Sequence, residues 1–243
     1  MSYIFYDILQ KHMPREFLTN GFYHVFNRGV EKRNIFRDNS DYVRFIHDLY
    51  EFNDKKPALP YIRRGSSNVG HTMSYIKRDK LVNLHIFTLM PNHHHLIIEP
   101  IKENGGYLFM KKLHCGYARG FNEKHKRSGY LFQGRYKDVY IKNDEQLAHL
   151  ICYIHSNPLS LWKDNWKEKK LTKLEIKQAI KFLEKYKWSS HLDYWGIKNF
   201  PSVIDNKFLL SFFGGPEKYQ KFFIDWLEQY QKNETYIQEL ILD

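Results

Sequence analysis

The 243-residue sequence predicts an α+β fold. Segments of alternating apolar character and segments of helical periodicity follow one another in the order strand, helix, strand, strand, helix, strand, helix. The two middle strands flank a Pro-Asn step, which favours a hairpin. This order is typical of a ferredoxin-like antiparallel sheet with helices on one face. A Lys-rich segment with helical periodicity follows and predicts a helical C-terminal extension.

The first elements can be placed from their boundary residues. A strand is expected at 22–28, closed by Gly29, and a helix at 41–52 with Ser40 as its N-cap. Residues 54–80 combine prolines and glycines with Arg and Lys, so we expect a mobile basic insertion there.

The remaining elements complete the core. We expect strands at 81–90, 93–99 and 136–142, and helices at 104–126, 144–157 and near 215–232. We therefore divide the chain into a core domain, residues 1–158 with the insertion inside it, and a helical extension, residues 159–243, that packs on the core.

Three consecutive histidines begin the second strand of the predicted hairpin. Side chains alternate along a strand, so His93 and His95 share one face and His94 points to the other. Two imidazoles at positions i and i+2 can hold one divalent metal ion. Exposed histidines at a turn are the alternative interpretation of this stretch.

A second motif lies on the predicted helix 144–157. Asn143 or Asp144 is its expected N-cap, and Pro158 ends it. Tyr153 and Asn157 stand four residues apart, so they project from the same side of the helix. The alternative is that Tyr153 is an aromatic at the edge of the core and Asn157 an ordinary helix C-terminal residue.

The composition favours a nucleic-acid partner. The formal net charge is +11, and 17% of the residues are aromatic. Excess Lys and Arg attract a phosphate backbone, and aromatic rings offer faces on which unpaired bases can stack. Single-stranded DNA or RNA fits both features. The basic residues concentrate in 111–142 and 163–187, so we expect a basic face around the two motifs.

Other sequence features limit the location of the protein. Two cysteines do not suggest a disulfide framework. The sequence has no apolar run that could span a bilayer, and residues 1–14 lack the pattern of a signal peptide. We expect a cytoplasmic protein without a membrane partner.

Five sequence blocks together resemble a known family. In the order of the chain they are YHVFNRG, MPNHHHL, LFQGRYK, YIHSNP and YKWSS, at 23–29, 90–96, 131–137, 153–158 and 186–190. The sequence is similar to HUH single-tyrosine transposases of the IS200-like group, and in particular to the REP-associated tyrosine transposase branch. One position departs from the family, because the middle residue of its His motif is normally apolar and here is His94.

The resemblance implies a mechanism for DNA strand cleavage and transfer in transposition. His93, His95 and Asn157 would hold the metal, and a mixed nitrogen and oxygen set with open positions suits Mg²⁺ or Mn²⁺. Tyr153 would be the catalytic nucleophile and would form a 5′-phosphotyrosine link. The expected substrate is single-stranded DNA that carries a hairpin, such as a REP-like hairpin.

Further residues are expected to contact DNA, and rival functions remain. The candidates are Asn27, Arg28, Arg63, Arg64, Gln133, Arg135 and Lys137. A monomer is expected, with a homodimer as the alternative. The rival functions are a domesticated, non-catalytic nucleic-acid-binding protein, a zinc hydrolase that uses the His cluster, and an HUH replication-initiator nuclease. The zinc hydrolase is disfavoured because no His-Glu-x-x-His or Cys-x-x-Cys pattern is present.

Overall fold

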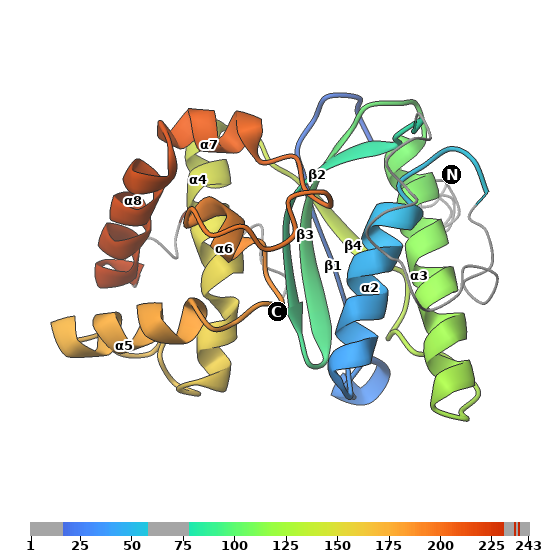
Figure 1. Ribbon diagram of the computed structural model, residues 1–243, viewed down its shortest axis with the longest axis horizontal. Helices are drawn as coiled ribbons and strands as arrows, with labels where there is room; N and C mark the ends of the chain where they lie inside the picture. Colours follow the sequence, from blue (N-terminus) through green and yellow to red (C-terminus); the bar gives the residue numbers. More distant parts are fainter. Residues whose placement is uncertain (1–16, 58–77, 231–235, 237, 239–243) are drawn as a thin grey trace, which may run out of the picture.

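The computed structural model describes residues 17–57, 78–230, 236 and 238. Its centre is one antiparallel sheet in the order β2-β3-β1-β4 (Figure 1). The strands are β1 (Tyr23–Arg28), β2 (Val82–Met90), β3 (His93–Pro100) and β4 (Lys137–Tyr140). This is the strand order of a ferredoxin-like sheet, so the predicted fold class is confirmed.

Helices cover both faces of the sheet. Helices α2 (Asn39–Glu51) and α3 (Gly105–Lys124) lie on one face, and α4 (Asp144–Ser156) lies on the other with the C-terminal helices (Figure 1). The expectation of helices on one face only was therefore wrong. The physical reason is visible in β2, where every residue from 84 to 90 is buried, so that both sets of alternating side chains need a cover.

The helix starts show which polar residues satisfy the first backbone N–H groups. The Asp38 carboxylate accepts a hydrogen bond from the Asp41 backbone N–H at 3.1 Å, so Asp38 is the N-cap of α2. Ser40 lies inside the helix, and the expectation that it is the cap was wrong. At α4, the Asn143 side chain accepts from the Gln146 N–H at 2.9 Å. Both caps anchor helices that pack on the sheet.

The described part of the C-terminal extension is helical and returns to the core. It comprises the short helix η3 (Asn157–Leu161), then α5 (Lys173–Leu183), α6 (His191–Tyr194), α7 (Lys207–Phe213) and α8 (Pro216–Glu228). Helix α8 packs against both α4 and α5. The buried tryptophans Trp166, Trp188, Trp195 and Trp226 fill the space between these elements and the core.

The Trp-Ser-Ser segment covers an edge of the sheet. The backbone N–H of Leu89 on β2 donates to the carbonyl of Trp188 at 2.9 Å, and that of Ser190 donates to the carbonyl of Phe87 at 2.9 Å. Strand β2 is the outermost strand on its side. The extension therefore satisfies backbone groups that an open edge strand would expose.

The greater part of the predicted basic insertion, with Arg63 and Arg64, lies outside the described residues. Within the described part of the chain, no helix has the length and apolar character needed to cross a membrane.

Candidate active site

The three histidines alternate between the two faces of the sheet, as predicted. His95 turns toward α4, where its ring centroid lies 6.2 Å from that of Tyr153 at an interplanar angle of 87°. The His93 and His95 rings lie 5.1 Å apart. His94 faces α3 instead, and its Nε2 lies 2.9 Å from Nε2 of His114. The structure thus pairs His93 with His95 and separates His94 from both.

Each of the two paired imidazoles is held through its Nδ1. Nδ1 of His95 lies 2.9 Å from Nε2 of His24, which is fully buried on β1. Nδ1 of His93 lies 2.5 Å from the side-chain oxygen of Asn92. In both rings Nε2 is the nitrogen that would bind a metal ion, and partners at Nδ1 of this kind fix the ring orientation in metalloproteins.

Burial keeps His95 neutral. Its pKa lies well below the usual value, first because the ring is desolvated and then because the neighbouring His93, His24 and His94 rings and the Lys167 ammonium disfavour a further positive charge. A neutral imidazole is the form that binds a metal ion. The surroundings of His95 therefore favour its ligand form at neutral pH.

Helix α4 brings Tyr153 to the same face. Leu150, Ile151 and Ile154 on this helix are buried, which fixes how the helix is turned against the sheet. Tyr153 itself is only 1% exposed. Its hydroxyl oxygen lies 3.5 Å from Nζ of Lys167, which sits 4.4 Å above the centre of the ring.

Asn157 stands at the junction of α4 and η3. It is the C-cap of α4, one helical turn beyond Tyr153, and it is 6% exposed. Its side-chain nitrogen is buried without a hydrogen-bond partner among the described residues. A metal ion binds an amide through its oxygen, so this unpartnered nitrogen does not test the predicted ligand role, which rests on the position of Asn157 one turn beyond Tyr153.

A cavity of about 230 Å³ opens beside the His pair. His93 and His95 line it together with the five candidate DNA contacts that are described, and Phe26 and Gly134 complete the wall. The five are Asn27, Arg28, Gln133, Arg135 and Lys137. They come from β1, the 131–136 loop and β4, and the fold brings them together.

The structure limits the role of Asn27. Its side-chain nitrogen donates to the Gly134 carbonyl at 3.0 Å, and its oxygen accepts from the Arg28 backbone N–H at 2.9 Å. Both polar groups of the amide are therefore engaged inside the protein. Asn27 fastens the end of β1 to the cavity loop and holds the neighbouring cations in place.

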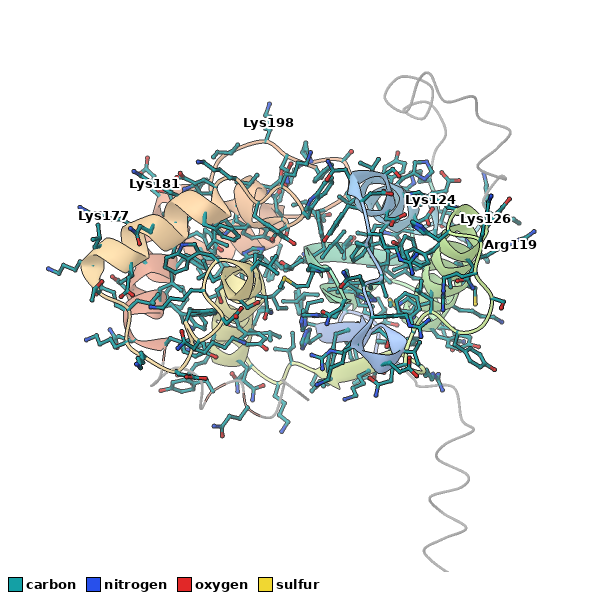
Figure 2. All side chains as sticks on the ribbon, turned by 90° about the horizontal axis from the view of Figure 1, so that it is seen from below. Arg119, Lys124, Lys126, Lys177, Lys181 and Lys198 are labelled. Atoms are coloured by element: carbon teal, nitrogen blue, oxygen red, sulfur yellow. The ribbon has the colours of Figure 1, made fainter. Side chains whose placement is uncertain are left out.

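The positive charge is less concentrated around the two motifs than the sequence predicted. The cavity carries Arg28, Arg135 and Lys137. Other exposed cations lie at opposite ends of the molecule (Figure 2): Arg119, Lys124 and Lys126 on or just after α3, and Lys177 and Lys181 on α5.

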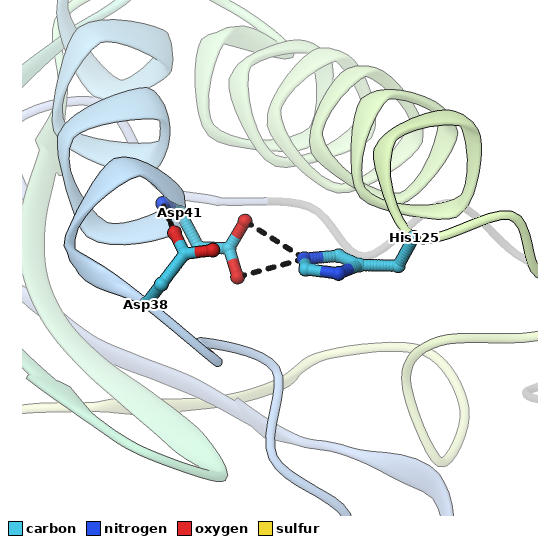
Figure 3. A group of neighbouring side chains, drawn as sticks. All are labelled: Asp38, Asp41 and His125. Carbon is cyan, nitrogen blue, oxygen red and sulfur yellow. Dashed lines mark hydrogen bonds and ion pairs between the residues drawn. The ribbon is translucent and has the colours of Figure 1, made fainter.

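A second group of potential metal ligands is satisfied internally. Among the described residues, Asp38, Asp41 and His125 gather their ligand atoms within 4.8 Å of one another (Figure 3). The Lys124 ammonium bonds both carboxylates at 2.7 Å. The Lys124 hydrogen bond is the main reason that the pKa of Asp38 lies well below its usual value. The group already holds a cation, and it joins α2 to α3.

Sequence reasoning missed two features of the site. His24 was placed only within the predicted strand 22–28, although a histidine at a buried position of an apolar strand was a signal. Its partner follows only from the register of β1 against β3, which the sequence does not state. Lys167 was one lysine among many in a Lys-rich segment, and no spacing rule connects it to Tyr153.

Comparison with known proteins agrees with the motifs. Residues 62–157 match the family model of IS200-like transposases, the group that the sequence blocks resemble. No curated protein matches the sequence. A solved structure of a REP-associated tyrosine transposase bound to a REP hairpin is similar, with 11% sequence identity and a TM-score of 0.44. The similarity covers 80% of this chain and 90% of that chain.

Proposed function

Residues 62–157 carry the sequence pattern of IS200-like transposases, and from this premise we propose that the protein cleaves and rejoins single-stranded DNA. The reaction is a metal-dependent strand transfer at hairpin-associated sites, with a 5′-phosphotyrosine intermediate. One observation carries the proposal: the Tyr153 ring packs against His95 in a single chain, and His95 lines a cationic cavity together with His93.

The donor set fits a divalent metal ion. His93 and His95 offer Nε2 atoms in rings that are held at Nδ1, and Asn157 offers its side-chain oxygen one helical turn beyond Tyr153. Two nitrogens and one oxygen leave open positions and suit Mg²⁺ or Mn²⁺. When bound, such an ion supplies positive charge to the phosphate as a Lewis acid.

Tyr153 is the nucleophile of the proposed reaction. Its oxygen attacks phosphorus, an Oη–P bond forms and the P–O3′ bond breaks. The phenol proton passes to solvent, and the departing 3′-oxygen takes a proton from solvent. The phosphodiester energy is kept in the new link, so the reverse attack of a 3′-hydroxyl rejoins a strand without a nucleotide cofactor.

The cavity binds the DNA backbone beside the cleavage point. Arg28, Arg135 and Lys137 supply charge for phosphates, and Gln133 is exposed and supplies a hydrogen-bonding group. Phe26 gives an apolar wall against which a base can rest. A strand that must enter this cavity has to be unpaired locally, which favours single-stranded DNA next to a hairpin stem over plain duplex.

The second candidate is a domesticated nucleic-acid-binding protein without catalysis. The net charge of +11 and the cationic cavity would serve both functions. The buried approach of Tyr153 to His95 favours the enzyme, because DNA binding alone does not need it.

A covalent-adduct assay tests the proposed function. The purified protein is incubated with end-labelled single-stranded oligonucleotides that carry a hairpin, in Mn²⁺ or Mg²⁺, and resolved on a denaturing gel. We expect a labelled protein band that requires the metal ion. Stable binding without any adduct across a panel of hairpins would support the non-catalytic function instead.

A further inference from the structure

A lysine from the C-terminal extension reaches the candidate nucleophile. Nζ of Lys167 lies 3.5 Å from the Tyr153 hydroxyl oxygen, in position to donate a hydrogen bond to it, and 4.4 Å from the centre of the Tyr153 ring. It also contributes to the positive potential at His95. Lys167 lies beyond residues 62–157, the segment that matches the transposase family, so the match does not assign a role to it.

Two residues that precede Lys167 anchor its loop. The neighbouring Trp166 is 1% exposed, and its ring packs 4.9 Å from that of Tyr230. Before it, the Lys163 ammonium pairs with the Glu175 carboxylate of α5 at 2.5 Å. These contacts hold the loop against α5 and Tyr230, so the backbone that carries Lys167 is fixed beside Tyr153.

The position suits a group that stabilises charge on the tyrosine oxygen. An ammonium ion in a site of reduced solvent access interacts with a developing negative charge more strongly than it would in water. In the cleavage step the charge lies on the Tyr153 oxygen, which is the attacking group. In the rejoining step the Tyr153 oxygen is the leaving group and carries the charge again.

We propose that Lys167 is a further catalytic residue of this site, which stabilises the Tyr153 oxygen while its bond to phosphorus forms or breaks. The inference rests on the proposed function. In cleavage, Oη–P forms and P–O3′ breaks. In rejoining, a 3′-hydroxyl loses its proton to solvent, O3′–P forms, and the electron pair of the broken P–Oη bond returns to Tyr153. Lys167 keeps its protons throughout and donates a hydrogen bond to that oxygen.

Single-turnover kinetics of adduct formation test the role. Lys167→Met removes the charge, Lys167→Arg keeps it, and Lys169→Met removes one charge from an exposed position of the same loop. With saturating oligonucleotide and Mn²⁺, we expect Lys167→Met to slow cleavage and rejoining by similar factors, about tenfold to hundredfold. Lys167→Arg should recover most of the rate, Lys169→Met should match the wild type, and Kd for the oligonucleotide should stay within about twofold in all three.

Two outcomes would overturn the role. A wild-type rate in Lys167→Met would show that the ammonium does not act in the chemical step. A weaker Kd with an unchanged rate at saturation would make Lys167 a phosphate contact. If Lys167→Met unfolds, as judged by its melting temperature, Lys167→Gln is measured in its place and the same two outcomes apply.

A spectroscopic arm separates failure of this inference from failure of the proposed function. The ¹³Cζ resonance of Tyr153 can be assigned by its loss in Tyr153→Phe, and it should move in Lys167→Met but not in Lys169→Met. If the resonance moves in Lys167→Met but the wild type forms no adduct, the enzyme function is refuted and the contact between Lys167 and Tyr153 is supported. An unmoved resonance would refute the contact, whatever the activity.

Discussion

The Tyr219 hydroxyl on α8 lies 2.6 Å from Nδ1 of His155 on α4. His155 is two residues beyond the candidate nucleophile. Its Nε2 lies 2.9 Å from the hydroxyl of Ser190, which donates to the Phe87 carbonyl of β2 at 3.1 Å. These buried hydrogen bonds join α4, the helix of Tyr153, to the C-terminal extension and to the sheet. Helix α4 is therefore held by residues of the same polypeptide.

The fastening of α4 leads to a prediction about the assembly. We expect a monomer in which Tyr153 serves the His pair of its own chain, because leaving this arrangement would break the bonds of His155 with Tyr219 and Ser190. Light scattering should give the mass of one chain. A mixture of Tyr153→Phe and His93→Ala should stay inactive, whereas restored cleavage would mean that two chains share the site.

The His155 bonds can be tested separately. Tyr219→Phe removes one hydroxyl and should lower the free energy of unfolding by about 1–3 kcal/mol, because Nδ1 of His155 is left buried and unpaired. Urea denaturation measures this loss. Tyr130→Phe is the control, since Tyr130 is 88% exposed and should change stability by less than about 0.5 kcal/mol. Equal effects of the two changes would contradict the importance of the buried chain.

The alternation of the histidines predicts different losses in three variants. His93→Ala and His95→Ala should lose metal-dependent cleavage. His94→Ala should keep most of the cleavage activity and lose stability instead, because His114 would lose its partner in the core. Adduct yield and the melting temperature, measured on the same samples, separate the two effects. Loss of cleavage in a folded His94→Ala protein would mean that the strand register assigned to the site is wrong.

The buried histidines predict a pH dependence of stability. Burial lowers the pKa of His114 and of His191 to about 3, and it lowers those of His94 and His155 well below the usual value. The unfolded chain binds protons on these rings below about pH 6.5 and the fold does not. Their contribution to stability is thus complete above that pH and is lost as the pH falls.

Each ring that stays neutral in the fold adds a loss on the order of 1 kcal/mol per pH unit below its unfolded pKa. Urea denaturation between pH 7.5 and pH 5 should therefore show a falling free energy of unfolding, with proton uptake on unfolding. A free energy that stays level across this range would contradict the neutral, buried state of these histidines in the fold.

Salt should weaken DNA binding steeply. A protein that neutralises about five phosphates on a single strand should show a slope near −3.5 for log K against log salt. Replacing Arg28, Arg135 or Lys137 by Gln should each make the slope less negative by about 0.7 if the cavity binds the DNA backbone. Filter binding at several salt concentrations measures the slope, and equal affinity for random duplex would indicate a general DNA-binding protein.

Local rules were enough for parts of this structure. The period of a strand predicts that His93 and His95 share a face, and the helical period places Asn157 one turn beyond Tyr153. The order of strands and helices along the chain predicted the ferredoxin-like sheet. These inferences hold because backbone geometry fixes them regardless of what packs around the elements.

Features that depend on tertiary contacts did not follow from the sequence. The pairing of His24 with His95 requires the register of two strands far apart in the chain. The contact of Lys167 with Tyr153 joins the extension to α4, and it follows a tryptophan, Trp166, that is buried in the extension. The helices of the second layer were predicted, but not the face of the sheet that they cover, because the sequence does not show whether a strand is buried on one face or on both.

The most direct test of the account is the identity of the residue that becomes linked to DNA. With Mn²⁺ and a labelled hairpin oligonucleotide, the wild type should form an adduct that mass spectrometry of tryptic peptides assigns to Tyr153. Tyr153→Phe should form no adduct while its DNA affinity stays within about 1 kcal/mol of the wild type, since only a nucleophilic hydroxyl is lost. An adduct that persists in Tyr153→Phe, or a link at another residue, would contradict the account.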